Sequence, residues 1–241
     1  MRYIGRLVLI AVLLGTLIAV PDVHAHRPES GSVEGITQIP DPSTSYAYYR
    51  ELDVSEPVHV YRFEAQAGQF FHAGINIPQI KGLEDFGVTL ALLGPGLPLI
   101  TQDAFQLTIA EAYADHVTQS PGSLVADLGL GANGGLVLAS ETSADFYEPF
   151  TQTRYWGRQT AELNLPESGV YHLLVWNPEG KVGKYVLDTG TQEVFGPTDL
   201  FRFPVWWMST RVFFEQTPQL VGALMVILAG VVGLVVYRRR R

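Results

Sequence analysis

The feature that most constrains this chain is an apolar segment near its C-terminal end. Residues 220–236 contain no charged or strongly polar side chain, and Tyr237 and four arginines follow them. Such a segment suits a membrane-spanning helix, which needs roughly 20 residues. Thr217 and Pro218 are suited to begin that helix, and arginines are typical of the cytoplasmic side of a span. The sequence therefore predicts a single-pass membrane protein with a cytoplasmic C-terminus.

The first 25 residues have the pattern of a cleaved secretory signal. Arg2 and Arg6 precede the apolar residues 7–20, and the small side chains of Val23 and Ala25 match what signal peptidase accepts. The apolar part is shorter than the roughly 20 residues of a spanning helix. An uncleaved N-terminal anchor is the alternative. If cleavage occurs, His26 is the first mature residue and everything up to the span lies outside the cytoplasm.

The part expected outside the cytoplasm is acidic and free of cysteine. Of the 16 basic and 24 acidic side chains, 10 and 23 lie between His26 and Thr217, which gives a net charge near −13. Such a charge disfavours nucleic acid and other phosphate-rich partners. Without disulfides, stability must come from a hydrophobic core, which a segment of this length can build.

Short runs of aromatic and β-branched residues, bounded by Gly, Pro or Asn, predict β-strands. Residues 66–69 and 177–180 separate neighbouring runs and suit hairpin turns. Without intervening helical periods, this pattern favours a mainly β ectodomain built as an antiparallel, jelly-roll-like β-sandwich. The predicted strands are residues 58–65, 70–77, 86–93, 169–176 and 181–190.

These patterns divide the chain into six consecutive parts. We expect a signal peptide (1–25), an extended N-terminal segment (26–45), a β-sandwich ectodomain (46–197), an aromatic juxtamembrane segment (198–217), a transmembrane helix (218–237) and a cytoplasmic basic tail (238–241).

The stretch GLGANGG, residues 129–135, contains the spacing G-x-G-x-x-G of a dinucleotide-binding loop. That loop works only where a helix follows the glycines, because the helix N-terminus supplies amides to the pyrophosphate. Here GGLVLAS follows, which predicts another strand. We therefore expect a turn or bulge and no bound dinucleotide.

Two segments resemble the bacterial pre-peptidase C-terminal (PPC) type of domain. VYRFEAQAGQFFHAGI and LPESGVYHLLVWNPEGKVGKYVLDTG contain its aromatic strand, its Ala-Gly-Gln turn and its paired Gly-x-Tyr strands. The resemblance covers about residues 58–93 and 165–190. It implies a small β-sandwich that serves secreted enzymes as an accessory or binding module, and it carries over no catalytic residue. The chain departs from the pattern in residues 94–164 and in having no protease domain.

The middle of the chain concentrates aromatic and basic side chains within residues 144–159. Aromatic and Arg clusters are typical of binding hot spots. The alternative is that these rings close one end of the sandwich, with the arginines paired to Glu148 or Asp145. The residues assigned to binding are Phe150, Arg154, Tyr155, Trp156 and Arg158.

A metal site is the second function that the sequence allows. Asp145 and Glu148 lie among dispersed acids that could bind calcium, although no calcium-loop spacing is present. A mature N-terminal His26 would offer an amino group and an imidazole to copper, joined by another histidine. The candidates for that second histidine are His59, His72, His116 and His172.

No catalytic motif or cysteine nucleophile is present in the sequence. We therefore expect a membrane-anchored, non-catalytic binding or assembly module with a protein or other extracytoplasmic ligand. The alternative is a copper- or calcium-binding accessory protein.

Residues 201–216 form an aromatic stretch just before the span. At helical spacing its aromatic rings share one arc, with Arg211 and Glu215 near the opposite side. We expect a short helix with Pro204 in its first turn, lying in the lipid interface. The alternative is that the stripe packs on the sandwich. The residues assigned to the membrane interface are Phe203, Trp206, Trp207, Phe213 and Phe214.

Overall fold

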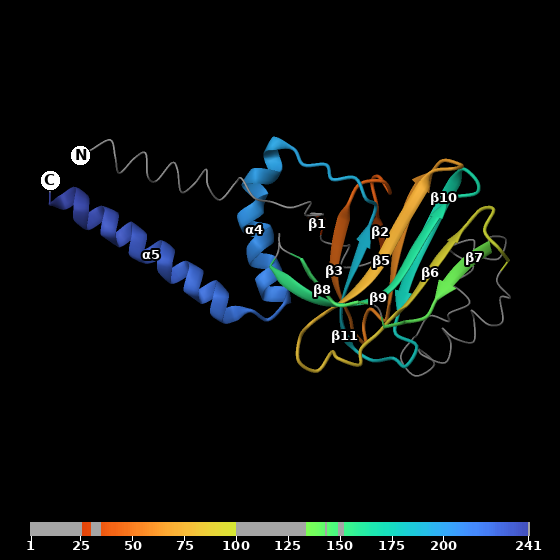
Figure 1. Ribbon diagram of the computed structural model, residues 1–241, viewed down its shortest axis with the longest axis horizontal. Helices are drawn as coiled ribbons and strands as arrows, with labels where there is room; N and C mark the ends of the chain where they lie inside the picture. The colour runs from red at the N-terminus through yellow and green to blue at the C-terminus, as the bar shows by residue number, and fades with distance from the viewer. Residues whose placement is uncertain (1–25, 30–34, 100–133, 143, 149–151, 241) are drawn as a thin grey trace.

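The computed structural model describes residues 26–29, 35–99, 134–142, 144–148 and 152–240. In this part of the chain, two β-sheets precede two C-terminal helices (Figure 1). We call the two sheets together the β domain. The six-stranded sheet has the order β1 (Arg27–Glu29), β3 (Tyr46–Leu52), β11 (Gly183–Thr189), β5 (Phe70–Pro78), β9 (Thr153–Asn164) and β8 (Phe146–Glu148). The five-stranded sheet has the order β2 (Ile36–Gln38), β4 (Val58–Ala65), β10 (Gly169–Trp176), β6 (Thr89–Gly94) and β7 (Gly134–Leu138).

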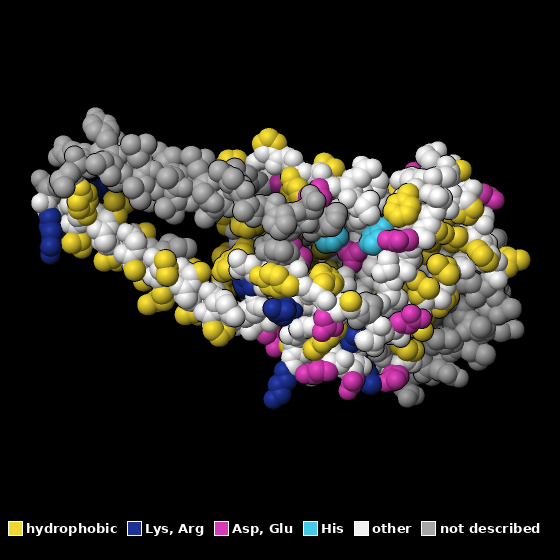
Figure 2. Space-filling model, viewed as in Figure 1, with side chains coloured by type: hydrophobic (Ala, Val, Ile, Leu, Met, Phe, Trp, Pro, Cys, Tyr) yellow, Lys and Arg dark blue, Asp and Glu magenta, His cyan; other side chains and the backbone are white. Residues whose placement is uncertain are grey.

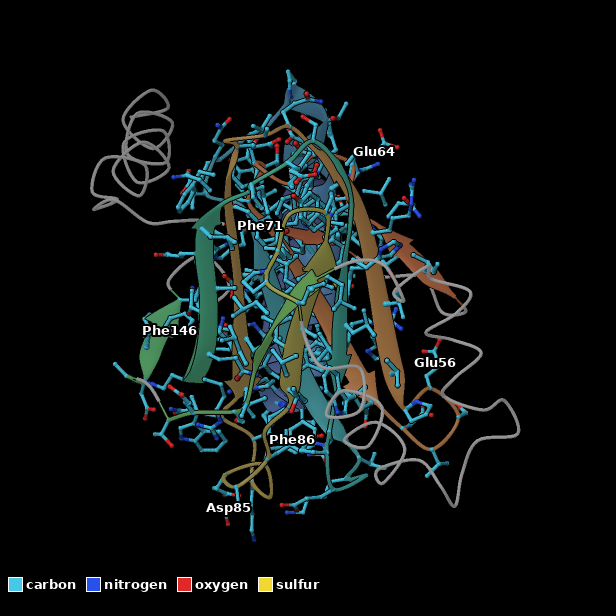
Figure 3. The ribbon with its side chains drawn as sticks, turned by 90° about the vertical axis from the view of Figure 1, so that its right-hand side faces the viewer. Glu56, Glu64, Phe71, Asp85, Phe86 and Phe146 are labelled. Carbon is cyan, nitrogen blue, oxygen red and sulfur yellow. The ribbon has the colours of Figure 1, made fainter. Side chains whose placement is uncertain are left out.

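The two sheets share one hydrophobic core. Phe63 of the five-stranded sheet stacks on Phe71 of the six-stranded sheet at 4.7 Å between ring centroids, and on Tyr171 at 5.6 Å. Figure 3 shows Phe71 between the sheets and Glu64 pointing away from them. Alternating side chains of both sheets fill the space between them, as expected for packed sheets. This core takes the place of the disulfides that the chain lacks.

The mainly β prediction is confirmed, but the sheets are mixed rather than antiparallel. β1 pairs with β3 and β2 pairs with β4 in parallel, while the other pairings are antiparallel. Neither β1 nor β2 pairs with the strand that follows it in the chain. Neither therefore forms a hairpin, which would require antiparallel pairing. The segment 26–45 thus adds one short edge strand to each sheet.

The runs 58–65 and 169–176 coincide with β4 and β10. Both predicted turns form, with Gly68 at φ 77° and Gly180 at φ 69°. β6 begins three residues after its predicted start, because the Phe86 amide donates to Leu83 O in a preceding turn.

The described residues of the segment 94–164, which was expected outside the family pattern, contribute strands to both sheets. These strands are β7, β8 and β9, and β9 lies beside β5 inside the six-stranded sheet. β7 confirms the strand predicted after the glycines of GLGANGG. The glycines before Gly134 lie outside the described residues.

Two helices follow the sheets. α4 (Pro197–Phe213) starts earlier than predicted, because Pro197 takes its first turn and the Asp199 carboxylate accepts a hydrogen bond from Gly196 N at 2.8 Å. Pro204 therefore lies inside the helix. α5 spans Thr217–Arg239. Its N-cap is Gln216, which lies one residue before the predicted cap, Thr217.

α5 is long and apolar enough to cross a membrane, and no other helix among the described residues is. In Figure 1, α4 lies along the β domain, whereas α5 runs across the direction of α4 and projects away. Figure 2 shows hydrophobic side chains along α5 and basic ones at its far end, while most acidic side chains lie over the β domain. α5 leaves the β domain at the C-terminal end of α4.

Candidate membrane-facing and binding surfaces

The C-terminal end of α4 packs on the outer face of the six-stranded sheet. Phe213 meets Tyr49 edge-on at 5.3 Å, and Phe214 meets Tyr155 edge-on at 5.3 Å. We call these four aromatic residues the docking cluster. Phe214 is only 5% exposed. The assignment of Phe214 to the membrane interface is therefore wrong, because the sheet takes up its apolar surface.

The rest of the predicted aromatic stripe is less buried than Phe214. Trp206 and Trp207 are half-buried, and Phe203 is exposed. The alternative that the sequence left open, packing of the stripe on the β domain, is the arrangement found at the C-terminal end of the helix.

Polar contacts link both ends of α4 to the six-stranded sheet, through hydrogen bonds at the C-terminal end and a long ion pair at the N-terminal end. At the C-terminal end, Lys184 Nζ lies 3.1 Å from Phe213 O and 2.7 Å from Glu215 Oε1. At the N-terminal end, Arg27 of β1 lies 3.9 Å from Asp199. The helix is therefore attached to both an inner and an edge strand of the six-stranded sheet.

Arg211 is buried, although helical periodicity placed it on the outside. It is 3% exposed, its guanidinium lies 5.0 Å from the Trp207 ring centroid, and it donates to Gln152 O at 3.3 Å. Burial lowers the pKa of Arg211, while Tyr147 and Glu148 nearby favour its charged form. A planar guanidinium can stack on an indole and still donate sideways, which suits this position.

The opposite side of α4 carries a second apolar face. Its members follow one another by four, three and four residues, so they share one side of the helix. Their spacing was readable in the sequence, but the larger aromatic stripe concealed it. This outer stripe consists of Phe201, Val205, Met208 and Val212, which are 82%, 58%, 42% and 63% exposed.

A groove of about 620 Å³ separates α4 from the edge of the β domain. We call it the α4 groove. Phe201 and Val205 of the outer stripe line its α4 side, and Pro28 and Tyr49 line its β-domain side. The outer stripe and the groove are therefore one continuous apolar surface.

β9 places the predicted binding residues in different environments. Tyr155 is buried under Phe146 and Phe214, whereas Trp156 packs against the core between the sheets. Arg158 is buried too, and donates to Phe86 O at 3.2 Å. A strand turns successive side chains to opposite faces, so these residues cannot form one surface.

The remaining members of the predicted binding set are Arg154 and Phe150. Phe150 lies outside the described residues. Arg154 is exposed, and its guanidinium lies 5.2 Å from the Tyr147 ring centroid. Phe146 and Tyr147, also exposed, belong to β8, which ends the six-stranded sheet. We call these three described residues the β8 edge; Figure 3 shows Phe146 at this side of the sheet.

Two of the three predicted metal ligands, His26 and Glu148, line one small pocket, and Asp145 does not. His26 Nδ1 lies 2.7 Å from Ser45 Oγ, and Asp145 accepts from Gln79 Nε2 at 3.1 Å. In the described part of the chain, no group of three or more His, Asp or Glu could hold a metal ion; His116 lies outside it. Copper or calcium binding stays a prediction that metal analysis of the purified protein can test.

The structure contains a polar network that the sequence did not reveal. His72 Nε2 lies 2.8 Å from Asp188 Oδ2, and His72 Nδ1 lies 3.0 Å from Glu162 Oε1. Asn76 donates to Asp188 Oδ1 at 2.5 Å. Gly74 leaves room for this carboxylate, because an added Cβ would come within 2.7 Å of both of its oxygens. These residues come from adjacent strands, so no sequence spacing links them.

Burial and partners shift the pKa values of this network. Burial alone would lower the pKa of His72, but its bonds to Asp188 and Glu162 outweigh that effect and raise it. Burial alone would raise the pKa of Asp188, but the His72 bond and nearby His26 charge outweigh that effect and lower it. Each partner therefore favours the charged form of the other.

The pKa of His59 shifts in the opposite direction to that of His72. Burial, with the Arg50 charge, lowers the pKa of His59 to about 3. Its Nδ1 lies 2.7 Å from Tyr185 Oη, which is 2.9 Å from Tyr61 Oη. His59 thus belongs to a buried network of side chains, in which its Nδ1 is already hydrogen-bonded.

Comparison with known proteins shows no family. No family model matches the chain, and no curated protein does. Among solved structures, it is similar to the g-type lysozyme inhibitor PliG of Aeromonas hydrophila, with 14% identity over 70% of this chain and all of that one, at TM-score 0.31.

Two further solved structures are similar at the same level. One is the pre-peptidase C-terminal domain of a Bacillus anthracis collagenase, with 8% identity, 68% and 96% of the two chains covered and a TM-score of 0.29. The other is CorA, a surface-associated copper-binding protein of Methylomicrobium album BG8, with 8% identity, 68% and 100% covered and a TM-score of 0.31. The PPC resemblance is therefore a weak likeness of fold that other kinds of protein share.

Proposed function

We propose that this protein is a membrane-anchored extracytoplasmic binding or assembly module that performs no catalysis. Its β domain, a sandwich of two mixed sheets, is held against the outer surface of the membrane. The β8 edge is the surface that it offers to a protein partner. The sequence supports a non-catalytic role, since it contains none of the nucleophile or metalloprotease motifs.

The observation that carries the proposal is the outer stripe of α4. One side of α4 is covered by the β domain, and four large apolar side chains face away on the other side. A helix that is apolar on both sides belongs in a core or in lipid. Because α5 leaves from the end of α4 and runs across it (Figure 1), a bilayer spanned by α5 would meet the outer stripe.

The contacts between α4 and the β domain restrict the orientation of the β domain relative to the membrane. Lys184 and the docking cluster hold the junction between α4 and α5, and Arg27 holds the other end of α4. A flexible tether would leave the domain free to rotate. Here the packed C-terminal end of α4, together with the ion pair at its other end, favours one orientation in which the same side of the domain faces the membrane.

The β8 edge has the chemistry of a protein-binding surface. An edge strand presents unpaired backbone groups to another chain. Here it also presents Phe146 on one face of the strand and Tyr147 on the other, with the Arg154 guanidinium over the Tyr147 ring. Aromatic and Arg side chains are the commonest hot-spot residues at protein interfaces.

Site-specific photo-crosslinking tests this assignment. A photoreactive phenylalanine at position 147, in native membranes, should give a discrete crosslinked product, and Arg154→Ala should weaken it several-fold. The matched control is the same probe at position 137, which is also exposed on an edge strand, β7, at the far end of the β domain in Figure 1. Equal products from both positions, or none from position 147, would remove the β8 edge as the binding surface.

A further inference from the structure

The geometry points to a lipid-binding site: we propose that the α4 groove takes one acyl chain of an anionic phospholipid from the extracytoplasmic leaflet, with Arg202 against its phosphate. The inference rests on the proposed position of α4 in the membrane surface. It adds a ligand class to a part of the molecule that would otherwise serve only as an anchor.

The groove has the size and lining of a ligand site. Its volume of about 620 Å³ lies within the range of small-molecule sites, roughly 300–1,000 Å³. Most of its lining is apolar, from both walls: Pro28, Tyr49, Phe201, Val205, Trp206 and Phe213. The attachments at the two ends of α4 keep these walls apart and in place.

Continuity with the outer stripe identifies the occupant. Phe201 and Val205 belong both to the exposed stripe and to the groove wall. A bilayer in contact with the stripe therefore reaches the mouth of the groove without crossing water. Lipid chains are the apolar groups present at highest concentration there, and filling the groove with one keeps water from its aromatic walls.

The headgroup must supply the selectivity. An acyl chain gains little by leaving the bilayer for an apolar groove, since lipid tails are as apolar as leucine side chains. Arg202 lines the groove and forms no ion pair with any described residue. Glu29 on the opposite wall is already paired with Arg27 at 3.0 Å. Arg202 is thus the charge left for a phosphate, which an arginine can bind with two parallel hydrogen bonds.

Photo-labelling of the full chain tests the site. The protein is reconstituted in phosphatidylcholine vesicles that contain a phosphatidylglycerol with a diazirine on one acyl chain. After illumination, label is expected on Tyr49 or Pro28, the groove wall on the β domain, as well as on α4. Bilayer contact alone would label only α4 and α5.

Matched variants separate the groove from the general membrane surface. Ser209→Trp, which fills the groove, should reduce label on Tyr49 and Pro28 several-fold, while Val212→Trp on the outer stripe should not. Ser209→Leu is the smaller variant if the tryptophan disturbs folding, which near-ultraviolet circular dichroism checks. Arg202→Gln should abolish the preference for this probe over its phosphatidylcholine counterpart.

The outcomes distinguish the two proposals. Label on α4 without label on Tyr49 or Pro28 would overturn the lipid site and leave the membrane contact intact. Label confined to α5 would overturn both. Label on the β-domain wall that Ser209→Trp or Ser209→Leu leaves unchanged would also overturn the lipid site, and an unchanged preference in Arg202→Gln would overturn the role given to that residue.

Discussion

Two arginines of this protein are buried where backbone carbonyl groups accept their hydrogen bonds. Arg158 and Arg211 were expected on surfaces, yet neither is exposed. Residue type gives the preference of a side chain for water, but its environment comes from strands and helices distant in the chain. For the same reason the His72 and Asp188 pair could not be predicted, because 116 positions separate its members.

Two histidines should give the β domain opposite pH dependences. His59 has a lowered pKa of about 3, so below pH 6.5 the unfolded chain binds a proton that the folded chain does not. Stability is then lost as the pH falls, by up to about 1.4 kcal/mol per pH unit. His72 has a raised pKa, so its contribution is complete below pH 6.5 and is lost as the pH rises through that raised value.

Chemical unfolding of the full chain in detergent, followed at pH 7 and pH 5, measures both effects. His59→Asn should remove about 2 kcal/mol of the stability loss between pH 7 and pH 5. His72→Gln should increase that loss, because the compensating proton uptake is gone. Asp188 has a lowered pKa, and its contribution disappears only as the pH falls below about 3.8. An unchanged pH dependence in His59→Asn would contradict the burial of this imidazole in its neutral form.

Strands and helices were predicted better than the environments of single side chains, wherever a local sequence pattern determines the strand or helix. β4 and β10 coincide with alternating apolar runs that end at glycine turns. β9 was missed, because an irregularity opposite Gly74 and Asn76 breaks its alternation and its aromatics resembled a binding loop. α4 was predicted as a helix, but two apolar faces made its outward side ambiguous, and only packing on Tyr49 and Tyr155 decides it.

Docking of α4 should depend on Phe214. Phe214→Ala removes a ring that is buried against Tyr155, and truncations of this kind cost about 3–5 kcal/mol. We expect the last turns of α4 to lose hydrogen-exchange protection while β4 and β10 keep theirs. Phe201→Ala is the control, because that ring is exposed and should leave the protection unchanged. Equal protection of α4 in both variants would mean that the docking cluster does not hold the helix.

At the scale of the whole molecule, the short aromatic and β-branched runs predicted a mainly β domain, and the C-terminal apolar segment predicted a long apolar helix after it. The mixed pairing was not predictable, because the edge strands β1 and β2 have three residues each and carry almost no periodic signal. The attachment of the helices to the β domain was not predictable either, since it depends on contacts such as Lys184 to Glu215. These contacts hold α4 against the β domain.

The central claim is that the β domain lies on the membrane with the outer stripe of α4 in lipid. The chain has no cysteine, so a single Val212→Cys can carry a nitroxide spin label in the full chain reconstituted in vesicles, with Val137→Cys on β7 as the control. The account predicts that oxygen, which concentrates in lipid, relaxes the label at position 212 more than a water-soluble nickel chelate does, with the reverse at position 137. If the nickel chelate relaxes the label at position 212 as strongly as the label at position 137, the outer stripe does not lie in lipid and the central claim is contradicted.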